Sequence, residues 1–264
     1  MIKKSLRYVF DRAGYEIRRK GVPFSNNFRK GGAECDRMIN MICNNTMVAR
    51  EGLVELYYQA LFCERRNIPG DFIECGVWKG GAVGLMALVN LCSSSYRRHI
   101  HLFDSFQEIC EPDESVDGKR ALWQVRQRKE NAGTKGRLAP LKGIYDHRGG
   151  PGTIQENREL LENKIGYDPK YLHYHQGWFQ DVLPEVYHDI EQIAILRIDA
   201  DWYASTKICL QYLFDKVVSG GFVIVDDYGA YDGCRQAVDE FVDGYGRPLY
   251  LNQVNQDIRY IIVP

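Results

Sequence analysis

Two apolar stretches, each followed directly by acidic residues, constrain the possible folds of this chain more than any other feature of its sequence. Residues 193–198 are mostly apolar and lead into Asp199, and residues 221–225 lead into Asp226 and Asp227. Both stretches have the composition of buried parallel strands. Ligands of open α/β sheets bind at the carboxyl ends of the strands. We therefore expect an α/β fold in which these carboxylates meet at one edge of the sheet.

Three carboxylates at one edge repel one another unless a cation neutralises them. A hard divalent ion with oxygen ligands suits such a site, and Mg²⁺ is the first choice. Asp199, Asp226 and Asp227 are thus the candidate metal ligands. For Asp201 we expect a different role, as the cap of a helix predicted over residues 203–218 or as an ion-pair partner.

A glycine turn between a strand and a helix predicts a second binding element. The strand covers residues 71–75 and the turn begins at Gly76, where the backbone can approach a ligand closely. A strand at residues 99–106 brings in Asp104, at a spacing suited to a ribose hydroxyl. Glu74 would repel the pyrophosphate that the dinucleotide fingerprint binds. The sulfonium and ammonium groups of S-adenosylmethionine suit a carboxylate better, which favours methyl transfer over an NAD(P)-dependent oxidoreductase.

The rest of the chain supplies helices and a covering segment. We expect two helices within residues 34–68, the second capped by Asn45 or Thr46, acting as a lid or a dimer surface. Residues 107–152 are polar and predict a second lid segment. Further predicted elements are a helix at 121–129, a helix capped by Thr153, a strand at 171–177, a helix at 234–245 and an antiparallel pair at 248–251 and 258–263.

Composition excludes several classes of protein. The 264 residues are 45% hydrophobic with a net charge of −1, which implies no general attraction to nucleic acid. We expect no transmembrane segment and no signal peptide, hence a cytoplasmic protein. The eight cysteines form no CxxC pair, so we interpret them as reduced core residues rather than zinc ligands. Residues 1–33 are basic and predict a solvated helix, with weak contact to a membrane surface as the alternative.

Five sequence blocks in order resemble the macrocin O-methyltransferase (TylF-type) family. They are residues 74–81, 103–106, 177–184, 196–201 and 225–228. The resemblance spans roughly residues 45–245 and implies a Rossmann-like class I methyltransferase fold. That fold has a mostly parallel seven-stranded sheet with an antiparallel last strand, helices on both faces and an N-terminal helical lid. We divide the chain into a helical preface, 1–68, and a methyltransferase domain, 69–264, with a lid insertion at about 107–152.

The resemblance also implies roles for individual residues. Asp199, Asp226 and Asp227 would bind Mg²⁺, and Asp199 would be the general base that takes a proton from a sugar hydroxyl. Trp202 and Ala204 depart from the usual family pattern. The implied contacts of S-adenosylmethionine are Glu74, Gly76, Val77, Asp104 and Ser105, with Trp178 and Asp181 at the adenine end and Thr46 and Met47 in a segment that reaches the site.

The remaining polar residues receive structural interpretations. We expect His101, His173 and His175 to be sheet residues rather than acid–base groups, and Lys79 and Arg197 to form surface contacts or ion pairs. Together these patterns predict an S-adenosylmethionine-dependent, Mg²⁺-assisted O-methyltransferase acting on a sugar hydroxyl, as a homo-oligomer without nucleic acid. A non-catalytic partner that kept the fold is the alternative from another class.

Overall fold

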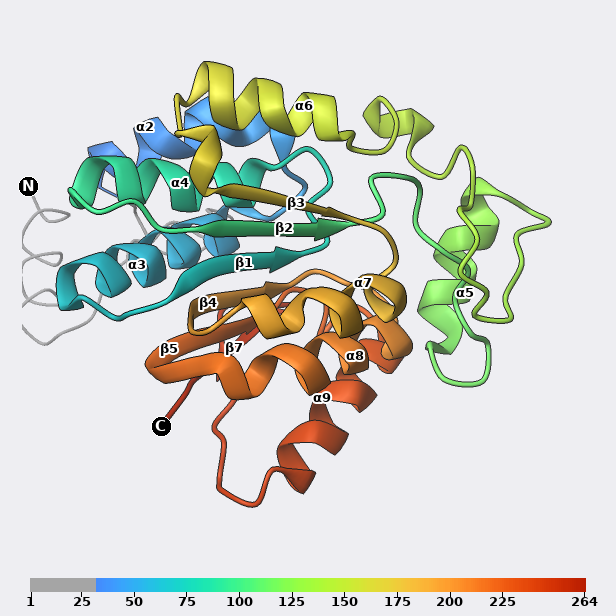
Figure 1. Ribbon diagram of the computed structural model, residues 1–264. Helices are drawn as coiled ribbons and strands as arrows, with labels where there is room; N and C mark the ends of the chain where they lie inside the picture. The colour runs from blue at the N-terminus through green and yellow to red at the C-terminus, as the bar shows by residue number, and fades with distance from the viewer. Residues whose placement is uncertain (1–31) are drawn as a thin grey trace, which may run out of the picture. The chain divides into compact units, whose positions relative to one another are not determined.

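The computed structural model describes residues 32–264 (Figure 1). The helix predicted in the basic N-terminal region therefore lies outside the described residues. Residues 31–264 form one compact unit. Over residues 32–264, no helix combines the length and the apolar character that crossing a membrane requires.

A seven-stranded sheet forms the centre of this unit, in the order β3-β2-β1-β4-β5-β7-β6. The first five strands pair in parallel, and β7 pairs antiparallel with both β5 and β6. This confirms the predicted sheet and its antiparallel last strand, but the strand that pairs with β7 at the edge covers residues 252–253 and not the predicted 248–251. The strands are β1 Asp71–Cys75, β2 Ile100–Asp104, β3 Leu172–Gln176, β4 Ile193–Ile198, β5 Val217–Val225, β6 Asn252–Gln253 and β7 Arg259–Ile262.

Helices cover both faces of the sheet, as predicted. Figure 1 shows α2, α3, α4 and α6 on one side and α7, α8 and α9 on the other, with α5 beyond the carboxyl ends of the strands. The helices are α2 Ala33–Ile42, α3 Arg50–Arg66, α4 Gly81–Ser93, α5 Gly118–Arg128, α6 Ile154–Arg158, α7 Phe179–Val186, α8 Tyr203–Leu213 and α9 Asp232–Gly244. A π-helical stretch, Glu159–Lys164, continues α6.

The apolar composition of β4 follows from its position in the middle of the sheet. All six of its residues are buried, including Arg197. Residues of a parallel strand covered by helices on both faces cannot alternate between core and solvent, so the strand is apolar on both sides. Arg197 is the one charged residue in this strand.

The helices α2 and α3 belong to the same core as the sheet. Met38, Ile42 and Leu56 lie in one buried cluster with Phe72 of β1 and Ile195 of β4. The compact unit begins at residue 31, so the packing shows no division at residue 68, where we placed the end of a helical preface. These helices pack directly on the sheet, because their apolar faces cover it.

Two predicted helix boundaries are wrong. The helix after β4 ends at Leu213 rather than Val218, because Val217 already pairs with Ile193 as the first residue of β5. The N-cap of α3 is Ala49, without a side-chain cap, and Thr46 instead accepts a hydrogen bond from the Val48 N–H. The predicted cap at Thr153 is confirmed by a reciprocal capping box with Glu156.

Candidate active site

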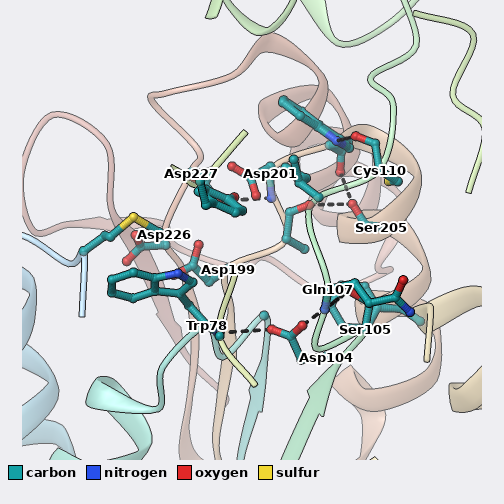
Figure 2. Close-up of a pocket in the computed structure, with 18 of the residues that line it drawn as sticks. Trp78, Asp104, Ser105, Gln107, Cys110, Asp199, Asp201, Ser205, Asp226 and Asp227 are labelled. Carbon is teal, nitrogen blue, oxygen red and sulfur yellow. Dashed lines mark hydrogen bonds between the residues drawn. The ribbon is translucent and has the colours of Figure 1, made fainter. Parts of the chain in front are cut away.

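A cavity of about 310 Å³ lies at the carboxyl ends of the parallel strands (Figure 2). Eight of the predicted site residues line it: Met47, Gly76, Asp104, Ser105, Trp178, Asp199, Asp226 and Asp227. Four predicted site residues are not among the lining residues: Thr46, Glu74, Val77 and Asp181. The sheet therefore brings the two predicted halves, the glycine turn and the acidic cluster, to one cavity.

The glycine turn after β1 is held in place by Asp104. Its Oδ2 accepts hydrogen bonds from the backbone N–H groups of Val77, at 2.7 Å, and Trp78, at 3.1 Å. Its Oδ1 accepts another from the Phe106 N–H, at 2.6 Å. Burial raises the pKa of Asp104, and these backbone hydrogen bonds oppose the shift. Asp104 thus fixes the shape of the turn in addition to facing the cavity.

Gly76 must be glycine at this point of the turn. Its φ of +87° lies in the left-handed region, and a Cβ would collide with the backbone carbonyl of Asp199. Trp78 and Asp201 also have left-handed φ values, +47° and +58°. Strained backbone of this kind concentrates at functional sites, where the surrounding structure enforces it.

Glu74 does not line the cavity. One of its carboxylate oxygens accepts from the Val83 N–H, at 3.2 Å, and the other pairs with Arg197. Burial raises the pKa of Glu74 to about 8, and the guanidinium of Arg197 opposes this shift. The structure therefore connects Glu74 to the start of α4 and to β4, and its predicted contact with a cofactor stays a prediction.

The acidic cluster forms because β4 and β5 lie side by side. Ile198 pairs with Val225, so the next residues, Asp199 and Asp226, leave the sheet together. One carboxylate oxygen each of Asp199, Asp226 and Asp227 lie within 4.8 Å of one another. No other group of three such ligands is found in residues 32–264. The predicted juxtaposition of the three carboxylates is present.

Arg197 neutralises part of this cluster, which confirms the ion-pair role predicted as one of its alternatives. Its side chain is 2% exposed and pairs with Glu74, Asp226 and, at 2.9 Å, Asp199. Burial opposes the charged guanidinium, but the three carboxylates outweigh it and raise the pKa of Arg197 above its usual value. A guanidinium of the protein itself therefore supplies one of the positive charges that we assigned entirely to a metal ion.

Carboxyl groups outnumber the one guanidinium that pairs with them in this cluster. Burial, with Arg197 opposing it, raises the pKa of Asp226 to about 6. Burial and the neighbouring carboxylates raise the pKa of Asp227 and of Asp201 well above the usual range. One guanidinium faces five carboxylates in this group, so the cluster retains capacity for a cation.

Asp201 does not cap α8, and that prediction is wrong. The Tyr203 N–H instead donates to Asp117, at 2.7 Å. The backbone N–H of Asp201 donates to Asp227 Oδ2, at 3.1 Å, and its left-handed φ turns the carboxylate toward the cavity (Figure 2). Within the described chain, that carboxylate has no hydrogen-bond partner. Asp201 therefore adds a carboxylate to the cluster of Asp199, Asp226 and Asp227.

Part of the cavity wall comes from residues to which the sequence argument gave no individual role in the site. Gln124 and Arg128 of α5, Tyr145, Trp202 and Tyr231 line it. The Tyr231 hydroxyl donates to Gln124, at 2.9 Å, and the Trp202 indole N–H donates to the Cys110 carbonyl, at 3.1 Å. The predicted lid segment therefore contributes directly to the site, although no spacing in its sequence marks these residues.

The class of protein follows from the fold and this cavity. A sheet in this order, with a glycine turn after β1 and an acidic residue at the end of β2, is the class I methyltransferase fold. The solved structure of the O-methyltransferase NovP matches with a TM-score of 0.71 and 26% identity, over 87% of this chain and 97% of that chain.

The chain belongs to the macrocin O-methyltransferase (TylF) family, whose sequence profile matches residues 3–131 and 155–261. The demethyldecarbamoylnovobiocin O-methyltransferase of Streptomyces niveus is 34% identical over 175 residues, 66% of this chain and 59% of that relative. A rhamnosyl-tetracenomycin C 4′-O-methyltransferase of Streptomyces olivaceus is 30% identical over 202 residues, 76% of this chain and 69% of that relative. The chain is therefore an O-methyltransferase, and the oxidoreductase and non-catalytic alternatives are set aside.

Proposed function

We propose that this enzyme transfers a methyl group from S-adenosylmethionine to a hydroxyl of a sugar, with Mg²⁺ held by Asp199, Asp226 and Asp227. The observation that carries the proposal is the convergence of these carboxylates within 4.8 Å at the cavity that also contains Gly76 and Asp104. The names of the relatives support a glycoside acceptor, since one of them methylates a rhamnosyl tetracenomycin.

The donor set fits a hard divalent cation. Arg197 engages one oxygen each of Asp199 and Asp226, and the Asp201 N–H engages one oxygen of Asp227. One oxygen of each carboxylate is thus left without a hydrogen bond from the described chain. Carboxylate oxygens are the ligands that Mg²⁺ prefers. When bound, such an ion would lower the pKa of a coordinated hydroxyl.

The residues of the chain hold the methyl donor and the acceptor in line. Gly76 leaves the backbone open to the donor, and Asp104 and Ser105 stand where β2 ends, for its ribose. Trp178 and Asp181 are proposed for the adenine end, and Val77, Thr46 and Met47 for the surrounding wall. Glu74 is proposed to act by fixing Arg197 and the start of α4. Correct positioning alone is worth about 7–11 kcal/mol of a reaction barrier.

Asp199 is the proposed general base, and Asp201 is a second candidate for this role. The observation that favours Asp201 is its carboxylate, which faces the cavity and accepts no hydrogen bond from the described residues, whereas Asp199 is paired with Arg197. A base with a raised pKa accepts a proton at neutral pH more readily than an ordinary carboxylate. Either residue would hold the proton that leaves the acceptor hydroxyl.

Replacing Asp201 by Asn separates the two candidates. If Asp201 is the base, kcat falls by about 10²–10⁴-fold while Mg²⁺ affinity, measured by calorimetry, stays within about twofold. An unchanged kcat assigns the proton to Asp199. An equal loss of Mg²⁺ affinity would instead make Asp201 part of the metal site.

Removing the metal tests the proposal as a whole. We expect EDTA to abolish the incorporation of labelled methyl groups into a panel of glycosides, and added Mg²⁺ to restore it, because the acceptor hydroxyl is a poor nucleophile at neutral pH without the ion. Binding of S-adenosylmethionine in EDTA, followed by thermal shift, is the control. Full activity in EDTA would contradict the metal role while leaving methyl transfer intact.

Other parts of the sequence interpretation stay proposals of the same kind. We propose a cytoplasmic homo-oligomer in which residues 107–152 and the segment around Met47 close over the bound substrates. Contacts consistent with a closing segment are present. The Trp78 indole N–H donates to the Gly150 carbonyl, at 3.2 Å, and Lys79 reaches the Arg148 and Gly149 carbonyls, each at 3.4 Å.

A further inference from the structure

Four of the six histidines of this chain gather on one face of β2 and β3, outside the catalytic cavity. His99 precedes β2, His101 lies within it, and His173 and His175 lie in β3. His101 pairs with His173 in the parallel register, and alternate residues of a strand share a face. The sequence interpretation of His101, His173 and His175 as sheet residues accounts for their position, and the proposed methyl transfer uses none of the four histidines.

The imidazole rings form two cross-strand pairs. His99 Nδ1 lies 2.7 Å from His173 Nε2, and His101 Nδ1 lies 3.0 Å from His175 Nε2. The rings of His101 and His175 are nearly parallel, with an interplanar angle of 3° and centroids 5.2 Å apart. All four histidines line a second cavity, of about 750 Å³, which gives solutes a path to them.

Asp71 orients one of the two pairs. Its Oδ2 lies 3.3 Å from His101 Nε2, on the side of the ring opposite His175. This contact favours the tautomer with the proton on Nε2, which leaves the lone pair of Nδ1 directed at His175. A carboxylate that holds one nitrogen of a histidine while the other binds a metal is the usual outer shell of metal sites in proteins.

The charges around the pair favour a cation. Burial, with the neighbouring imidazoles adding to it, lowers the pKa of His175 to about 4, so its ring is neutral at neutral pH. Asp189 and Glu191 line the same cavity and add negative charge, while Arg98, which also lines it, is paired with Glu64 at 2.7 Å. Neutral imidazole nitrogen is a ligand for zinc, copper and nickel ions, whereas Mg²⁺ prefers oxygen.

We propose that His101 and His175 bind a first-row transition-metal ion, Zn²⁺ in the first place, with Asp71 as the orienting partner. Two nitrogens at about 2.0–2.1 Å from a tetrahedral zinc ion lie about 3.3 Å apart, so the His101 Nδ1–His175 Nε2 pair, now at 3.0 Å, has to open by about 0.3 Å to admit the ion. The ion takes the place of the proton shared by the pair, which moves to His175 Nδ1, and water completes the coordination. Bound metal would clamp the edge strand β3, which leads into Gly177 and Trp178 of the catalytic cavity.

Zinc titration of the metal-depleted full chain tests this site. Isothermal calorimetry is carried out in excess Mg²⁺, so that the carboxylate cluster is occupied by a competing ion. We expect His175→Gln and His101→Gln to abolish the binding event. Asp71→Asn should weaken it by about 10–100-fold, as loss of an outer-shell partner does. His188→Gln is the matched control, because His188 belongs to neither cross-strand pair, and this variant should bind zinc like the wild type.

Two measurements keep the test decisive if a variant folds poorly. The electron paramagnetic resonance spectrum of Cu²⁺ bound to the wild-type chain should show coupling to nitrogen, and a spectrum with oxygen ligands only would overturn the proposal. Zinc should also bind Asp199→Asn with unchanged affinity. Loss of zinc binding in that variant would place the ion at the carboxylate cluster. Zinc affinities of His101→Gln and His175→Gln equal to that of the wild type would also contradict the proposed site.

Discussion

Replacing Asp199 by Asn should reduce methyl transfer by about 10³-fold or more while S-adenosylmethionine still binds. Asp199 is one of three carboxylates whose oxygens lie within 4.8 Å, so the amide removes charge from the proposed metal site. It also removes the proposed base. The proposed donor contacts, Gly76 and Asp104, make no hydrogen bond with the Asp199 carboxylate, and Gly76 packs against the Asp199 backbone, which this substitution leaves unchanged.

Three measurements separate these effects. Single-turnover methyl transfer reports chemistry, calorimetry with Mg²⁺ reports the metal, and calorimetry with S-adenosylmethionine in EDTA reports the donor. Asp215→Asn is the matched control, because Asp215 is exposed and lies in the turn before β5, away from the cavity. Loss of donor binding together with intact Mg²⁺-dependent chemistry would show that the roles of the two halves are misassigned.

The two acid-tipped strands and the acidic edge could be predicted because each depends on a local pattern. One apolar run precedes Asp199, and another precedes Asp226 and Asp227. Short apolar runs of this kind are typical of buried strands. Two parallel neighbours then place their carboxyl ends together whatever the loops do. Gly76 could be predicted for a similar reason, since the turn it forms tolerates no side chain.

The remaining parts of the site depend on contacts between distant segments, which no local pattern encodes. Arg197 differs from its neighbours only by being charged within an apolar strand, and its three partners come from β1, β4 and the end of β5. Asp201 was assigned to a cap that Asp117, 86 residues before Tyr203, provides instead. A charged residue inside an apolar run is the signal that would have identified Arg197 as the centre of a buried ion-pair group.

Replacing Arg197 by Met should lower the free energy of unfolding by about 3–5 kcal/mol, the cost of leaving buried partner charges unpaired. Its side chain is 2% exposed, and that of Glu74 is equally buried. Natural domains are stable by only about 5–15 kcal/mol, so urea should unfold this variant at a much lower concentration. Arg50→Met is the matched control. Arg50 pairs with Asp36 at a half-exposed site, where the loss should be at most about 1 kcal/mol.

The stability of the Arg197→Met variant should also respond more strongly to Mg²⁺ than that of the wild type. Without the guanidinium, Asp199 and Asp226 keep their charge only if another cation replaces it, and a ligand that binds only the folded state stabilises it. Adding Glu74→Gln should recover part of the loss, because the amide removes the most deeply buried of the unpaired charges. Thermal unfolding with and without Mg²⁺ measures both effects. An equal Mg²⁺ response in variant and wild type would mean that the guanidinium and the proposed ion do not share the same carboxylates.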